Sequence, residues 1–139
     1  MSPSVRRFLV LAPAVLLDTA FGLDLLGRLF DAEGAWTLGA HAAVAGVAAG
    51  LLAGLPAGTP GPRAGRGRRV RFAALYGAGL ALFALARWVR GDAAIAPEPV
   101  LVAVEGIADA LVLAGAGAGG FLDRWLGDGP CGGRSAAAR

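Results

Sequence analysis

Residues 8–30 read FLVLAPAVLLDTAFGLDLLGRLF, and this almost unbroken apolar run decides the class of the protein. A helix needs about 20 mostly apolar residues to cross the hydrocarbon core of a membrane. The first run has that length, and three similar runs follow it, so we predict spans at about 8–30, 35–55, 70–88 and 100–122. The predicted fold class is all-α, an integral membrane bundle of four transmembrane helices.

The composition of the chain supports the same class. Of the 139 residues 56% are hydrophobic and only 17% are charged, and the mean hydropathy is +0.62. A soluble domain of this size rarely has such values. The 23 glycines form no collagen-like triplets, and an aromatic content of 7% excludes a glycine-rich aromatic repeat protein.

Polar segments rich in turn residues separate the four runs, at 31–34, 57–69 and 91–99. We therefore expect one transmembrane domain over residues 1–127 and a flexible cytoplasmic tail over 128–139. Cys131 lies in that tail and is the single cysteine of the chain, which excludes a disulfide framework. The first run is longer than a secretory signal and is interrupted by Asp18, so we expect an uncleaved first span.

The arginines predict the orientation in the membrane. Ten of the 13 basic residues fall in the N-terminal segment, the middle loop and the tail, whereas Arg28, Arg87 and Arg90 fall on the other side. Cytoplasmic loops carry the excess of positive charge, so both termini and the middle loop are expected in the cytoplasm. We take the basic charge as a topology signal in the cell membrane of a bacterium, and we expect lipid contact and no nucleic-acid binding.

Small residues at four-residue spacing predict close helix packing, because lipid offers no hydrophobic drive for helix association. In the second span this stripe is Gly46, Gly50 and Gly54, which we also considered for self-association. Ala73, Gly77 and Ala81 repeat the spacing in the third span. In the fourth span we expect packing at Gly115 and Gly119 rather than phosphate binding, although residues 115–120 match a G-x-G-x-x-G pattern.

Ionisable residues inside the spans are the candidate functional residues, because charge in hydrocarbon is costly. With a rise of about 1.5 Å per residue, Asp18 and Asp109 share the mid-membrane level. Asp24, His41 and Glu105 share an outer level, within reach of two arginine side chains. The predicted intramembrane polar network is Asp18, Asp24, Arg28, His41, Arg87, Glu105 and Asp109.

Two interpretations of this network remain open. In the first, Arg28 and Arg87 pair with Asp24 and Glu105 and fix the helix register, with the acids facing the bundle interior. In the second, Asp18 and Asp109 form a proton or cation relay.

His41 is expected to be a hydrogen-bonded packing residue, although a symmetric dimer would supply two histidines for haem. No catalytic or metal-binding motif is present. We therefore expect no enzyme activity, no cofactor and no metal.

The order of several short motifs resembles a bacterial and archaeal membrane protein family, the domain of unknown function two-two-three-one. The motifs are GLDLLG at 22–27, Trp36 in the following turn, LARWVR at 85–90 and GGFLDRWLG at 119–127. The resemblance covers about residues 8–127 and implies a four-helix membrane unit found beside redox proteins. Its pattern corresponds to Asp24, Arg87, Gly119 and Gly120 of this chain.

The chain departs from that pattern at two places. It has Ala12-Pro13 where family members often have His-Pro, and an apolar run at 72–76 where they often have a histidine. The role that we expect is a non-catalytic membrane scaffold or partner subunit, with a homo-oligomer or a redox membrane protein as partner. The alternatives are a small proton-coupled transporter or channel and a haem- or quinone-contacting electron-transfer subunit.

Overall fold

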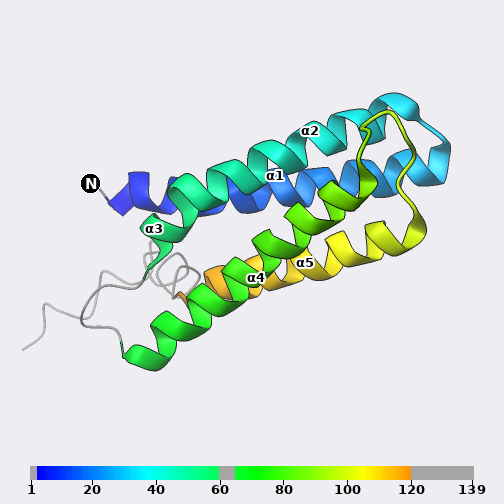
Figure 1. Ribbon diagram of the computed structural model, residues 1–139. Coiled ribbons are helices and arrows are strands. Elements are labelled where there is room, and N and C mark those ends of the chain that lie inside the picture. Colours follow the sequence, from blue (N-terminus) through cyan, green and yellow to red (C-terminus); the bar gives the residue numbers. More distant parts are fainter. Residues whose placement is uncertain (1–2, 60–64, 120–139) are drawn as a thin grey trace, which may run out of the picture.

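The computed structural model describes residues 3–59 and 65–119, and within these ranges every regular element is a helix. The elements are α1 (Pro3–Phe30), α2 (Glu33–Ala49), the π-helix η1 (Gly50–Gly54), α3 (Leu55–Gly58), α4 (Arg66–Arg90) and α5 (Pro99–Ala118). Because α2, η1 and α3 follow one another without a break, the described chain has four long helical rods (Figure 1). The predicted tail at 128–139 lies outside the described residues.

All four rods are long and apolar enough to cross a membrane: Val5–Phe30, Glu33–Ala57, Arg66–Arg90 and Pro99–Ala118. This confirms the prediction of an all-helical protein with four apolar helices. The first three helices are somewhat longer than the predicted spans, because residues at their ends continue the helix beyond the apolar stretch. The last residues of the fourth predicted span, 120–122, are not among those described.

The turn between α1 and α2 contains only Asp31 and Ala32. The N–H of Ala32 donates to the carbonyl of Gly27 at 2.9 Å, and Asp31 has a φ of 51°. This is the Schellman arrangement that closes a helix, with aspartate in the left-handed conformation that it tolerates better than most residues. The tight turn makes α1 and α2 an antiparallel hairpin.

The wide turn of η1 directly precedes Pro56. A proline inside a helix has no N–H to donate and its ring clashes with the carbonyl four residues earlier. The N–H of Leu55 donates to the carbonyl of Gly50, five residues back, so the helix is already widened where the proline enters. Helix α3 therefore continues the direction of α2 past a residue that would otherwise break it.

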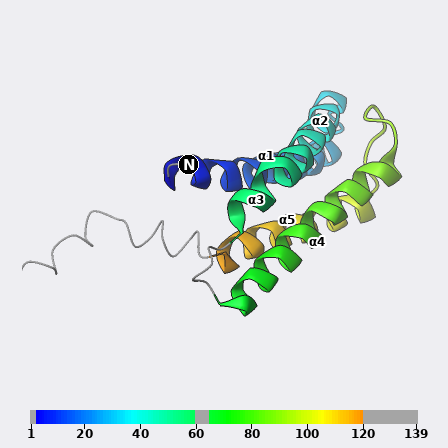
Figure 2. The same ribbon diagram turned by 60° about the vertical axis from the view of Figure 1, so that its left-hand side comes forward.

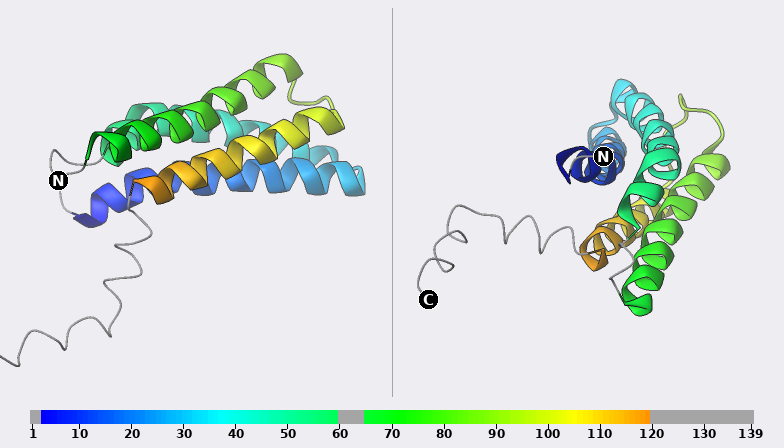
Figure 3. Two further views of the ribbon diagram at one scale, coloured as in Figure 1. Left: turned by 90° about the horizontal axis from the view of Figure 1, so that it is seen from below. Right: turned by 90° about the vertical axis from the view of Figure 1, so that its left-hand side faces the viewer.

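The bundle consists of two hairpins, α1–α2 and α4–α5 (Figure 2). They meet through α1 against α5 and, less closely, through α2 against α4 (Figure 3). The core between them is apolar and is built around Val10, Leu17, Phe72, Tyr76, Leu80, Phe83 and Val112. The α1–α2 turn and the α4–α5 loop lie at the same end of the bundle, which we call the turn end (Figure 1).

Helices α4 and α5 approach so closely that glycine is required at the contact. A Cβ on Gly115 would lie 2.6 Å from the backbone nitrogen of Tyr76, and one on Gly79 would lie 2.6 Å from the carbonyl oxygen of Ala108. Neither backbone atom can move aside without shifting its helix. The expected packing role of Gly115 is thus seen in the structure as a contact with α4.

The outer surface of the bundle is apolar while several charges lie inside it. Leu52 and Trp88 are 82% and 84% exposed, whereas Asp24 and Glu105 are buried. A protein folded in water would place these groups the other way round. The distribution agrees with the four apolar helices in indicating a membrane protein.

Candidate functional site

A buried ion pair joins the two hairpins near the turn end. Nη1 of Arg90, the last residue of α4, donates to Oδ2 of Asp24 on α1 at 2.8 Å, and both side chains are almost completely buried. Burial of two charges is costly unless they are paired and hydrogen-bonded. The pair is therefore a point at which the relative position of α1 and α4 is specified.

Backbone carbonyls satisfy the rest of the Arg90 guanidinium. Nη2 donates to the carbonyls of Trp36 at 3.1 Å and Ala93 at 3.2 Å, and Nε donates to that of Ile95 at 3.1 Å. Arg90 thus contacts α1, the start of α2 and the α4–α5 loop at once. Two further hydrogen bonds attach α2 to the same loop, from Trp36 Nε1 to Ala94 and from the Thr37 hydroxyl to Ala93.

Glu105 on α5 lies beside this ion pair. Its carboxyl group interacts with that of Asp24 and feels the charges of Arg87 and Arg90. Oε2 of Glu105 and Oδ1 of Asp24 are buried and accept no hydrogen bond from a described residue. We call this group of two acids and two arginines (Asp24, Glu105, Arg87 and Arg90) the Asp24–Glu105 cluster. One oxygen of each acid in it accepts no hydrogen bond from a described residue.

The structure corrects the expected ion pairs. Arg28 is exposed at the end of α1 and does not pair with Asp24 or Glu105. Arg87 is near both acids but makes no hydrogen bond to either, and its buried Nη1 has no partner among the described residues. The partner of Asp24 is Arg90, which sequence reasoning had treated only as a topology residue. The rotation of each helix about its own axis, which depth along the helix does not give, selects the pair.

Asp18 and Asp109, which were expected at the mid-membrane level, lie at the contact between α1 and α5. Asp109 is buried, its Oδ1 has no hydrogen-bond partner among the described residues, and it interacts electrostatically with Asp18. Asp18 itself is exposed on the outer surface of α1. The expectation that the acids face the bundle interior therefore holds for Asp24, Glu105 and Asp109 but is wrong for Asp18.

His41 is exposed on α2, and its Nδ1 lies 2.7 Å from the carbonyl oxygen of Thr37, one turn earlier. It does not belong to the Asp24–Glu105 cluster, although it was expected at the same level. Among the described residues no group of three His, Cys, Asp or Glu side chains is arranged to hold a metal ion.

The glycine stripe of the second span packs inside the chain. A Cβ on Gly46 would meet Leu17 of α1, and those on Gly50 and Gly54 would meet Leu80 and Tyr76 of α4. These contacts leave the stripe no free surface for a second copy, contrary to our suggestion of self-association there. Gly119 caps α5, where its N–H donates to the carbonyl of Gly115.

The predicted stripe of the third span does not pack as expected. Ala73 and Ala81 are exposed, and a Cβ on Gly77 would meet nothing within 4 Å. The face of α4 that enters the core carries Phe72, Tyr76, Gly79, Leu80 and Phe83 instead. The large side chains decide which face is buried, because they supply more contact area than the small ones.

Comparisons with known proteins add no relative to this description: no family model, no curated protein and no solved structure matches the chain. Over residues 3–59 and 65–119 the fold is all-helical, with four helices that are long and apolar enough to cross a membrane. The resemblance to the domain of unknown function two-two-three-one stays a prediction from the motifs, as does the redox association that it implies.

Proposed function

We propose that this protein is a non-catalytic membrane subunit that assembles with another protein surface along the contact between α1 and α5. Its four helices would span the cell membrane of a bacterium with both termini in the cytoplasm. It would act as a scaffold or partner subunit. The resemblance of its motifs favours a redox membrane protein as the partner, and a second copy of the chain is the simplest alternative.

The observation that carries this proposal is the exposure of Asp18. Asp18 precedes the end of α1 by 12 residues, which corresponds to about 18 Å at 1.5 Å per residue. That depth is near the middle of a membrane about 30 Å thick. A charged side chain facing lipid there costs about 2.5–3.5 kcal/mol on insertion scales. A partner surface that supplies a hydrogen-bond donor or a positive charge to Asp18 offsets that cost.

Asp109 supports the same surface. Its buried Oδ1 has no hydrogen-bond partner and lies close enough to Asp18 for the two charges to interact. Two acids with unused hydrogen-bonding capacity on neighbouring helices can accept donors from a partner helix. Intramembrane ionisable residues usually pair with one another or face a bundle interior. The contact between α1 and α5 therefore fits an assembly surface better than a lipid-facing one.

The state of assembly tests the proposal. The native protein is extracted with its surrounding lipid by a membrane-solubilising polymer, and the mass of the particles gives the number and kind of protein chains. We expect more than one chain per particle, in a fixed ratio. Asp18→Leu should release single chains, because a leucine at this position is compatible with lipid.

Glu33→Gln is the matched control, since Glu33 is also an exposed acid but lies at the start of α2. Its assembly should equal that of the native protein, and circular dichroism should show the same helix content for both variants. Single native chains in the particles would overturn the proposal. Assembly of Asp18→Leu that matches the native protein would overturn the role of Asp18.

A small proton-coupled transporter or channel is the second candidate function. The observation in its favour is the electrostatic interaction of Asp18 with Asp109, since paired acids at mid-membrane level can pass a proton between them. In an oligomer the same surface would line the path. Proton flux distinguishes this function from a purely structural role.

A further inference from the structure

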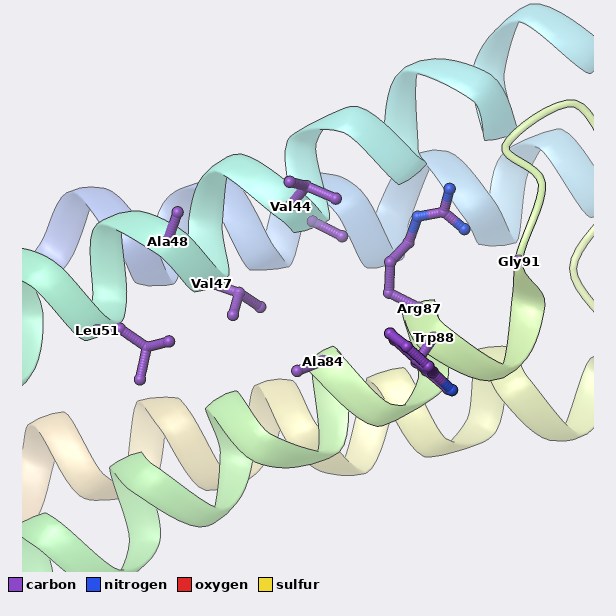
Figure 4. Close-up of a pocket in the computed structure, with 9 residues that line it drawn as sticks. Val44, Val47, Ala48, Leu51, Ala84, Arg87, Trp88 and Gly91 are labelled. Atoms are coloured by element: carbon purple, nitrogen blue, oxygen red, sulfur yellow. The ribbon is translucent and has the colours of Figure 1, made fainter.

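An apolar groove runs between α2 and α4 on the outside of the bundle (Figure 4). Its volume is about 670 Å³, and its walls include Val44 and Val47 of α2, Leu51 of η1, and Ala84, Arg87 and Trp88 of α4. The groove is distinct from the contact between α1 and α5 that carries the proposed assembly. Its lining is apolar except near Arg87.

Two of the contacts that the rod of α2 and η1 makes with α4 lie at points near the two ends of the groove. Toward η1, Leu80 of α4 packs against Gly50. At the turn end, Arg90 of α4 donates to the carbonyl of Trp36. Between these points both walls carry small side chains, including Ala48 and Ala84, that do not fill the space. The groove is the space that these small side chains leave open between the two helices.

Arg87 supplies a positive charge at the turn end of this groove. Figure 4 shows its guanidinium extending from α4 toward α2. The side chain of Arg87 makes no hydrogen bond or ion pair with a described residue, and its buried Nη1 has no partner among them. Arg90 already pairs with Asp24, and Glu105, which feels the charge of Arg87, makes no hydrogen bond to it. The groove therefore has a cation with a buried donor that lacks an acceptor among the described residues.

The position of Arg87 along α4 suits a lipid headgroup. It precedes the last residue of α4 by three positions, about 4.5 Å at 1.5 Å per residue. This places it near one membrane surface, where an arginine can reach the phosphate layer. Trp88 follows it and is 84% exposed. Tryptophan is enriched at the level of lipid headgroups.

We propose that the groove between α2 and α4 binds one anionic phospholipid, with its phosphate on Arg87 and an acyl chain between α2 and α4. The apolar walls match the chain and the unpaired guanidinium matches the acidic headgroup. Basic pockets between transmembrane helices bind acidic headgroups in this way. A zwitterionic phospholipid offers the same phosphate but brings a choline cation beside Arg87, so its contact with the guanidinium is weaker.

Quenching of Trp88 fluorescence tests the site. The protein is reconstituted in bilayers of phosphatidylcholine, and phosphatidylglycerol with brominated acyl chains is added in steps, because bromine quenches a nearby indole. The signal of Trp88 is the difference between the native protein and Trp88→Phe. We expect half-quenching at a mole fraction at least five times lower for phosphatidylglycerol than for brominated phosphatidylcholine.

Arg87→Gln should remove this preference. Arg28→Gln is the matched control, because Arg28 is an exposed arginine at the same end of the bundle but lies on α1, away from the groove. It should leave the titration unchanged. Ala84→Leu fills the groove without changing charge and should also abolish the preference, so a folding defect of Arg87→Gln would not hide the result.

Three outcomes would overturn the proposal. The first is equal quenching by the two lipids in the native protein. The second is an unchanged preference in a folded Arg87→Gln. The third is loss of the preference on addition of millimolar inorganic phosphate, which would assign Arg87 to a soluble anion instead of a lipid. The assembly measured for Asp18→Leu has no bearing on any of these, so the two proposals fail separately.

Discussion

Arg90 and Asp24 are 66 positions apart in the chain, yet their side chains form a buried ion pair of 2.8 Å between α4 and α1. Arg90 also donates to three backbone carbonyls, so a single side chain connects both hairpins and the loop that closes one of them. The charges of Glu105 and Arg87 lie beside the pair. The turn end of the bundle is organised around this contact.

Removal of one partner of the pair should destabilise the protein strongly. Asp24→Leu is expected to lower the free energy of unfolding by about 3–5 kcal/mol, because it leaves Arg90 buried and charged without its carboxylate. The loss in the double variant Asp24→Leu/Arg90→Leu should be smaller than the sum of the two single losses. Denaturant titration in a mild detergent measures these values. Arg28→Gln should stay within about 0.5 kcal/mol of the native protein.

Lysine at position 90 should not restore the stability that Arg90 provides. The arginine uses Nε, Nη1 and Nη2 to hold one carboxylate and three carbonyls in different directions. An ammonium group is a compact charge and cannot reach all four acceptors. We expect Arg90→Lys to cost about 1.5–3 kcal/mol, the value of one or two lost hydrogen bonds to a charged group. Unfolding of Arg90→Lys at the native denaturant midpoint would contradict this.

The two central glycines of α4 and α5 should respond differently to an added methyl group. Gly115→Ala places a Cβ 2.6 Å from the Tyr76 backbone and should cost about 1–3 kcal/mol through overpacking. Gly77→Ala enters open space and should be neutral or stabilising by up to about 1 kcal/mol, since alanine favours helix more than glycine does. The same denaturant titration compares them. Equal effects would show that the close contact of α4 with α5 is absent in solution.

The expected cytoplasmic C-terminus can be tested with the native chain, because Cys131 is its single cysteine. A membrane-impermeant maleimide should label Cys131 in inside-out vesicles and not in intact spheroplasts. Asp92→Cys in a Cys131→Ser background lies in the α4–α5 loop and should give the opposite pattern. Labelling of Cys131 from outside would reverse the orientation that the arginines predict.

A measurement of proton flux distinguishes the two proposed functions, a non-catalytic membrane subunit and a proton-coupled transporter. If Asp18 and Asp109 serve only assembly, proteoliposomes of the native protein and of Asp18→Asn/Asp109→Asn should show the same low proton permeability. A relay would instead give a native flux that the double variant reduces at least tenfold. A pH-sensitive dye inside the vesicles records the rates. Glu33→Gln serves again as the control that changes an acid outside the contact between α1 and α5.

The four spans could be predicted from sequence because their determinant is local. A run of about 20 apolar residues is a span whatever its neighbours are, and α1, α2 to α3, α4 and α5 follow the four runs. The polar turns were also readable, since Asp31 and Gly91 occupy the positive-φ positions that end α1 and α4.

Rotation of each helix about its axis was decided only by the tertiary structure. Arg87 and Arg90 are three residues apart, so their positions along α4 make them equally plausible partners for Asp24. Only Arg90 donates hydrogen bonds to acceptors on α1, α2 and the α4–α5 loop, whereas Arg87 lines the groove. Asp18 faces outward although its level matches that of Asp109. Span length is a property of one segment, whereas a buried pair depends on how several helices pack against each other at once, and no single segment encodes that.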